Sequence, residues 1–80
     1  MISKKIPATD KDGQTVEVTI REWTGADLRR MREKQTGWDE DLVINGLPAD
    51  VVDRLTYSEI KRLNKSIVAL STADTDKAGN

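Results

Sequence analysis

Apolar and polar side chains alternate in the first quarter of the chain. Val16, Val18 and Ile20 stand at every second position, with polar residues between them. Since successive side chains of a strand point to opposite faces, this spacing predicts a strand with one apolar and one solvent-facing side. The preceding residues alternate more loosely, and a polar cluster that ends in Gly13 separates the two runs. This pattern predicts an N-terminal β-hairpin over residues 2–21.

A first helix is predicted over residues 25–35, because Thr24 and Asp27 have the spacing of a capping box. The Thr24 hydroxyl can accept a hydrogen bond from the Asp27 amide, while the Asp27 carboxylate reaches back to the Thr24 amide. The apolar stripe of this helix is short and rests on Leu28 and Met31. We therefore expect a tryptophan from a neighbouring segment to help cover it.

Two short helices are predicted next, over residues 39–45 and 48–55. The first begins with three acids, which the positive end of the helix dipole favours. Gly46 follows it as a C-terminal stop. Pro48 stands near the first turn of the second helix, where its missing amide costs little.

The last helix is predicted over residues 57–70. Thr56 and Glu59 have the spacing of a second capping box. Apolar side chains then recur at spacings of three and four, namely Ile60, Leu63, Ile67 and Leu70. Residues 71–80 are small, polar and unpatterned, which predicts a disordered tail.

These elements predict an α+β fold, in which an N-terminal β-hairpin is followed by three or four short helices. The chain of 80 residues is one small domain at most, with its folded part over residues 1–70. Its hydrophobic content of 36% is low and its charged content of 34% is high. The core must therefore be thin, and we expect marginal stability or stabilisation by a partner.

The chain contains no cysteine and no histidine. Disulfides, thiolate zinc sites, cysteine nucleophiles and histidine bases are therefore excluded, and we expect neither an enzyme nor a bound cofactor. The acids of residues 39–41 could bind a divalent cation, but they lack the spacing of a calcium loop. Acids at a helix start are the commoner explanation, so no metal site is predicted.

No apolar run is long enough to cross a membrane, and the N-terminus lacks the apolar region of a signal peptide. We therefore expect a soluble, cytoplasmic protein. The formal net charge is -1, yet charge is unevenly placed, with five acids and no base over residues 35–53. The net charge argues against bulk binding to nucleic acid.

Three stretches carry a resemblance to a known family. They are residues 18–28 (VTIREWTGADL), 44–55 (INGLPADVVDRL) and 56–64 (TYSEIKRLN). They resemble the strand and Asp-Leu helix entry, the glycine–leucine–proline stretch and the final helix of small tail assembly proteins of long-tailed bacteriophages. The chain departs from that family in having Trp23 where proline is common, and in a shorter, more acidic second helix.

The resemblance implies a phage or prophage tail assembly chaperone. Such a protein binds the tape measure protein, assists polymerisation of the tail tube protein around it in the host cytoplasm, and is absent from the mature virion. A small, thinly packed domain that offers a shallow apolar groove to helical segments suits this role.

Candidate contact residues lie in the first helix and around the second, where the demand of the core is least certain: Leu28, Met31, Trp38, Leu42 and Val43. The alternative is a small phage or prophage regulator that binds nucleic acid or a host protein through the basic residues of the first helix. These are Arg29, Arg30, Arg32 and Lys34. The commoner explanation of the same basic residues is a solvated helix face, in which Arg29 and Arg30 pair with Glu33. The oligomeric state is left open.

Overall fold

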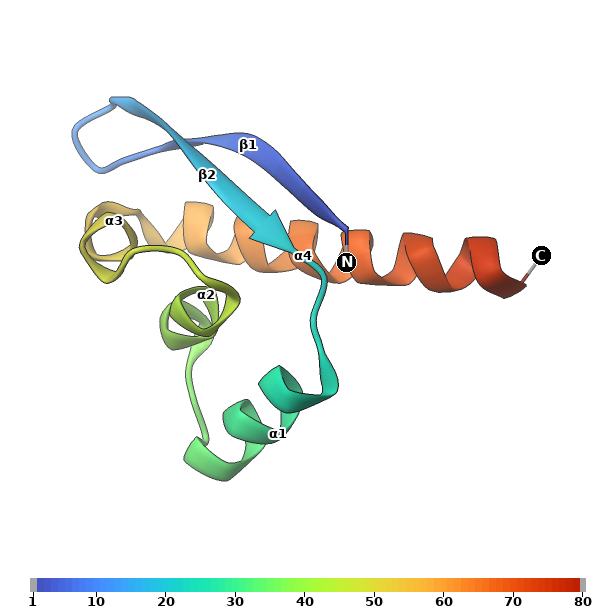
Figure 1. Cartoon of the computed structure of the whole chain (residues 1–80). Coiled ribbons are helices and arrows are strands. Elements are labelled where there is room, and N and C mark those ends of the chain that lie inside the picture. The colour runs from blue at the N-terminus through green and yellow to red at the C-terminus, as the bar shows by residue number, and fades with distance from the viewer. Residues whose placement is uncertain (1, 80) are drawn as a thin grey trace.

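The computed structural model describes residues 2–79, with side chains as far as Thr72 (Figure 1). Its elements in chain order are β1 (Ser3–Thr9), β2 (Thr15–Arg21), α1 (Gly25–Lys34), α2 (Trp38–Asn45), α3 (Ala49–Arg54) and α4 (Tyr57–Gly79). The predicted α+β fold, with a hairpin at the N-terminus followed by helices, is confirmed.

The hairpin follows the predicted alternation. Strands β1 and β2 are antiparallel, with Ile6 opposite Val18 and Ala8 opposite Val16. Asp10 organises the turn between them, because its carboxylate accepts hydrogen bonds from the amides of the turn at 2.8 and 2.9 Å. Gly13 has a φ of 82°, a left-handed conformation that glycine adopts without steric cost. One face of the hairpin is therefore apolar and faces the helices.

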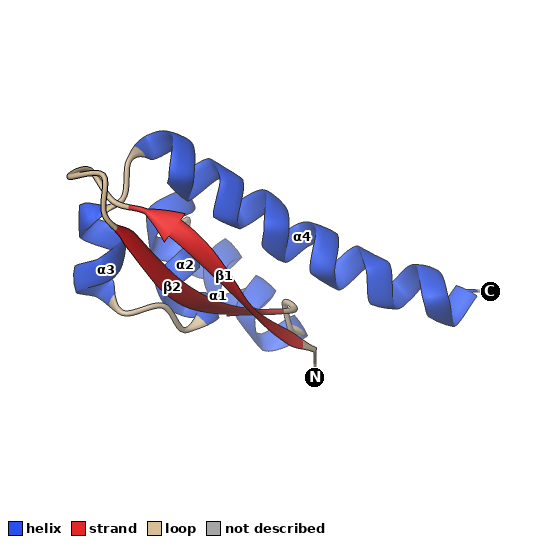
Figure 2. Ribbon diagram, turned by 90° about the horizontal axis from the view of Figure 1, so that it is seen from above, coloured by secondary structure: helices blue, strands red, loops and turns tan. Residues whose placement is uncertain are grey.

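The core lies where the hairpin and α2 pack against the long helix α4 (Figures 1 and 2). The largest fully buried side chains come from one strand and two helices: Ile20, Leu42, Leu63 and Ile67. Smaller contributions come from the segment around α3, including Leu47 and Val52. Among the residues whose side chains are described, no aromatic side chain is fully buried, which agrees with the low aromatic content of the chain.

The first capping box forms as predicted. The Thr24 hydroxyl accepts from the Asp27 amide at 3.2 Å, and the Asp27 carboxylate accepts from the Thr24 amide at 3.0 Å. The second box is only half formed, which corrects the prediction. The Glu59 amide donates to Thr56, but the Glu59 carboxylate accepts from the amide of Thr9 at 2.8 Å and from Arg62 at 2.7 Å. The donor that replaces the Thr56 amide is the Thr9 amide of the hairpin, which is 50 residues away from Glu59 in the sequence and so is not part of the local capping pattern.

Element boundaries agree with the prediction to within a residue, except at the end of the chain. Helix α4 is 23 residues long and continues past residue 70 to Gly79, so the last helix is not short. The predicted disordered tail, residues 71–80, falls mostly on residues whose side chains lie outside the description. That expectation stays a prediction.

Candidate functional site

A groove of about 680 Å³ lies between α1, the start of α2 and the exposed side of α4. Its apolar lining comes from all three helices and from the segment before α1: Trp23, Leu28, Met31, Trp38, Val68 and Ala69. Polar side chains complete it: Asp41, Lys61, Asn64, Lys65 and Thr72. A smaller hollow of about 390 Å³ lies beside Trp38, against Tyr57.

Large apolar side chains of this groove are exposed to an unusual degree. Leu28 is 49% exposed, Trp38 is 45% exposed and Val68 is 54% exposed. Single exposed apolar residues are normal on a protein surface, but these three line one continuous depression. The gathering of exposed apolar side chains in one depression makes this groove the candidate site for contact with another molecule.

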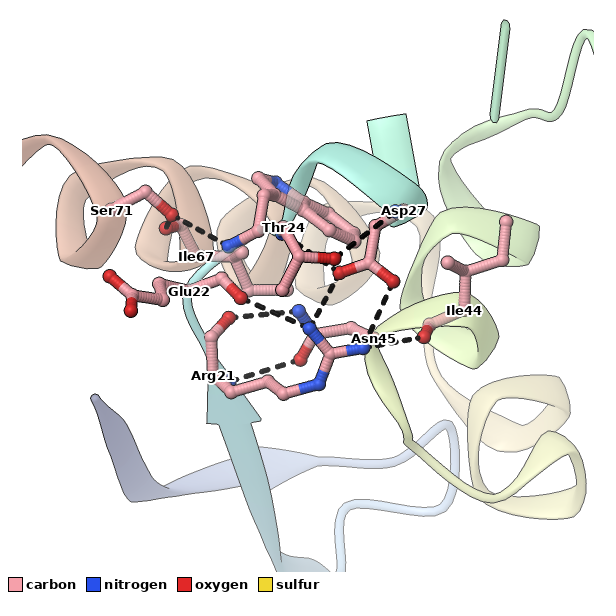
Figure 3. A network of polar contacts seen from close by, with 9 residues as sticks. Arg21, Glu22, Thr24, Asp27, Ile44, Asn45, Ile67 and Ser71 are labelled. Atoms are coloured by element: carbon pink, nitrogen blue, oxygen red, sulfur yellow. Dashed lines mark hydrogen bonds and ion pairs between the residues drawn. The ribbon is translucent and has the colours of Figure 1, made fainter. Parts of the chain in front are cut away.

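Polar contacts hold helix α1 in place, so its apolar residue Leu28 can stay exposed while Met31 is half-buried. Its buried residue is Asp27, a carboxylate, and not Leu28. The Asp27 carboxylate receives two hydrogen bonds from the Arg21 guanidinium, at 2.6 and 3.1 Å (Figure 3). Bidentate arginine–carboxylate pairs are among the strongest polar contacts in proteins. One wall of the groove is thus attached to the body without use of its own apolar face.

The Arg21–Asp27 pair belongs to a wider network that joins β2 to α1 and α2 (Figure 3). The Arg21 guanidinium also donates to the carbonyl oxygens of Glu22 and Ile44, each at 3.1 Å. The buried Asn45 side chain accepts from the Arg21 amide at 3.1 Å and donates to the Arg21 carbonyl at 2.9 Å. Asn45 therefore completes the backbone hydrogen bonding of β2 where the sheet ends.

Side chains of helix α4 bind the two segments that carry the tryptophans of the groove, namely the segment before α1 and the start of α2. Ser71 accepts a hydrogen bond from the amide of Trp23 at 2.9 Å. Asn64 donates to the carbonyl oxygen of Trp38, the first residue of α2, at 3.0 Å. Both contacts place a tryptophan backbone against α4, and both tryptophans line the groove.

Trp38 forms a second feature at the end of the groove. Its ring stacks on that of Tyr57, with centroids 5.9 Å apart and an angle of 11° between the planes. The Lys61 ammonium lies 5.5 Å from the Trp38 ring and 5.4 Å from the Tyr57 ring. A cation above an aromatic face is attracted by the negative potential of the ring. This contact holds the Lys61 ammonium at the groove.

The structure divides the candidate contact residues into two sets. Leu28, Met31 and Trp38 line the groove together. Leu42 is wrong as a contact residue, because it is 0% exposed and belongs to the core. Val43 is partly buried against the same core and does not line the groove. Helix α2 packs against α4 and α3. Leu42 and Val43 therefore serve the interior, whereas Trp38 at the start of the helix reaches the groove.

Sequence reasoning missed the contribution of α4 to the groove. Lys61, Lys65, Val68 and Ala69 line it, and none of them was a candidate contact residue. One signal was available, because Val68 widens the apolar stripe of the last helix beyond what a core-facing helix requires. The alternative basic residues of α1, namely Arg29, Arg30, Arg32 and Lys34, are all exposed. In the part of the chain with described side chains, neither Arg29 nor Arg30 pairs with Glu33.

Acid should weaken the attachment of α1. The hydrogen bonds from Arg21 first, and those from Thr24 next, lower the pKa of Asp27 from 3.8 to about 2. Because the folded pKa is the lower one, the stabilisation is complete above the unfolded pKa and is lost as pH falls through the folded pKa. We expect a loss of about 2 kcal/mol of unfolding free energy from this group between pH 4 and pH 2.

Urea unfolding followed by circular dichroism, repeated across that pH range, measures this loss. The Asp27→Asn variant is the control, since it cannot titrate at this position. Glu59, whose pKa is lowered mainly by Arg62, titrates in both proteins and cancels in the comparison. Equal pH dependence in the variant and the unmodified chain would show that the Arg21–Asp27 pair contributes nothing.

No protein-family model, curated protein or solved structure matches this chain. Among the helices that the structure describes, none is both long enough and apolar enough to cross a membrane. Among the described residues, no three acidic side chains gather as metal ligands. Asp41 of the acidic segment instead accepts a hydrogen bond from the Thr36 hydroxyl.

Proposed function

We propose that this chain is a non-enzymatic binding module that holds an apolar helical segment of another polypeptide in the groove between α1 and α4. The observation that carries the proposal is the joint exposure of Leu28, Trp38 and Val68 along one depression. Binding of an amphipathic helix in an apolar groove is a recurring mode of peptide recognition.

The shape and chemistry of the groove support a polypeptide over a small metabolite. The groove is an open trough between two helices, and its lining is mainly apolar. Its positively charged groups, Lys61 and Lys65, stand on α4 one helical turn apart. A second helix can lie in such a trough, with its apolar stripe against Leu28 and Val68.

The resemblance to phage tail assembly proteins suggests which polypeptide this is. We propose that the client is the tape measure protein, and that the chain acts as a tail assembly chaperone in the host cytoplasm. A long helical client can be covered by many copies, each bound weakly. Weak single contacts with high multiplicity permit each copy to be displaced as the tail tube protein polymerises.

Calorimetric titration of the chain with helical fragments of a tape measure protein of a long-tailed phage tests this function. The double variant Leu28→Asp/Val68→Asp should bind at least about 30-fold more weakly, because buried apolar anchors dominate such interfaces. Ile2→Asp is the matched control, since Ile2 is also an exposed apolar residue but belongs to the hairpin. Binding by none of the fragments, or equal binding by all three proteins, would refute the proposal.

The basic residues of α1 give a second candidate function, namely binding of nucleic acid. This candidate differs in its response to salt, because nucleic-acid binding through several cations weakens steeply as salt rises. Capture of an apolar helix through Leu28 and Val68 should change little between low and high salt. Loss of DNA binding in an Arg29→Gln/Arg30→Gln variant, with fragment binding absent, would favour the regulator.

A further inference from the structure

The groove has a positively charged border. Lys61 and Lys65 both line it and stand one turn apart on α4. Neither ammonium pairs with a carboxylate within the part of the chain whose side chains are described. Arg32, exposed on α1, follows Leu28 by one turn and so lies on the same side of that helix.

The groove has fewer negative than positive side chains among its described lining residues. Asp41 is the carboxylate among its described lining residues, and this side chain accepts a hydrogen bond from the Thr36 hydroxyl. The local excess is therefore positive, although the whole chain has a formal net charge of -1. Positive groups that pair with no carboxylate and lie beside an apolar surface favour an occupant of opposite charge.

Lys61 is held in position before any occupant arrives. Its ammonium lies about equally far from the Trp38 and Tyr57 ring centroids, at 5.5 and 5.4 Å. The contact with the rings restricts a side chain that is otherwise flexible, while the ammonium hydrogens that point away from the rings can still donate. Less side-chain freedom is then lost when a carboxylate binds.

We propose that the occupant of the groove is an acidic amphipathic helix, in which carboxylates at positions i and i+4 border the apolar stripe and contact Lys61 and Lys65. The spacing follows from helix geometry, since side chains four residues apart stand on one face of each helix. This inference rests on the proposed function, because it names the chemistry of the client that the groove takes.

Three synthetic helical peptides test the inference. They share one leucine stripe and differ only in the bordering residues, which are glutamate, glutamine or lysine. Their helicity is matched by circular dichroism, and binding is measured by calorimetry at low and high salt. From the strength of exposed ion pairs, we expect the glutamate peptide to bind about three- to ten-fold more tightly than the glutamine peptide at low salt. This preference should shrink at high salt.

Charge-reversed proteins identify the groups responsible. The Lys61→Glu/Lys65→Glu variant should reverse the order of the peptides. The Lys5→Glu/Lys11→Glu variant carries the same change of charge on exposed residues of the hairpin, and should keep the original order.

The outcomes separate the two proposals. Equal binding of the three peptides, or tighter binding of the lysine peptide, overturns the acidic client and leaves the apolar groove in place. If no peptide binds and Leu28→Asp/Val68→Asp alters nothing, the proposed function fails as well. An oligonucleotide that displaces the glutamate peptide, and binds more tightly than it, assigns Lys61 and Lys65 to phosphate and overturns the inference.

Discussion

Replacing Leu63 with alanine should lower the free energy of unfolding by about 3 kcal/mol. Leu63 is 0% exposed and lies in the core between α4, the hairpin and α2. Removal of its side chain loses apolar burial and leaves a cavity that close-packed neighbours fill only in part. A domain of this size is stabilised by only about 4–12 kcal/mol in total, so the loss is a large fraction of it.

Urea unfolding followed by circular dichroism measures this effect. Leu28→Ala is the matched control, because it makes the same chemical change at a side chain that is 49% exposed. The control should lose about 1 kcal/mol or less, since little apolar burial is removed. Similar losses in the two variants would mean that the core does not lie where the structure places it.

Replacing Asp27 with alanine should also cost about 3 kcal/mol, for an electrostatic reason. The substitution leaves the Arg21 guanidinium without its carboxylate partner and removes the carboxylate half of the capping box of α1. The Arg21 side chain is 26% exposed and so keeps some contact with solvent. We therefore expect the loss of unfolding free energy to lie at the lower end of the range of about 3–5 kcal/mol that is typical for breaking a buried ion pair.

Amide hydrogen exchange distinguishes this variant from one with a damaged core. Because polar contacts hold α1, Asp27→Ala should speed exchange in α1 more than in α4, whereas Leu63→Ala should speed exchange throughout. Glu59→Ala is the control, since it removes the carboxylate of a pair in which Arg62 is 46% exposed. That control should cost about 1 kcal/mol. Uniform exchange in Asp27→Ala would contradict the role assigned to the pair.

The Asp27 variant also links stability to function. The groove needs α1 as one wall, and α1 contributes Leu28 and Met31 to it. Released from Arg21, the helix no longer holds these side chains opposite Val68. We therefore expect Asp27→Ala to weaken client binding even though Asp27 does not line the groove.

Local patterns in the sequence were sufficient to predict the strands and helices and several of the residues at which they begin or end. The alternation of Val16, Val18 and Ile20 predicted β2, and the Thr24–Asp27 spacing predicted the start of α1. These features succeed because the interacting groups are few residues apart, so the spacing alone brings them together.

Contacts between segments far apart in the chain could not be predicted from local sequence patterns. The burial of Leu42, the pairing of Asp27 with Arg21 and the capture of Glu59 by the hairpin all depend on how the elements pack. Periodicity tells which side chains share a face of a helix, but it does not tell which neighbour covers that face. The groove exists because α1 is anchored through a carboxylate and so keeps its apolar side chains free, a result of packing that spacing along the chain does not reveal.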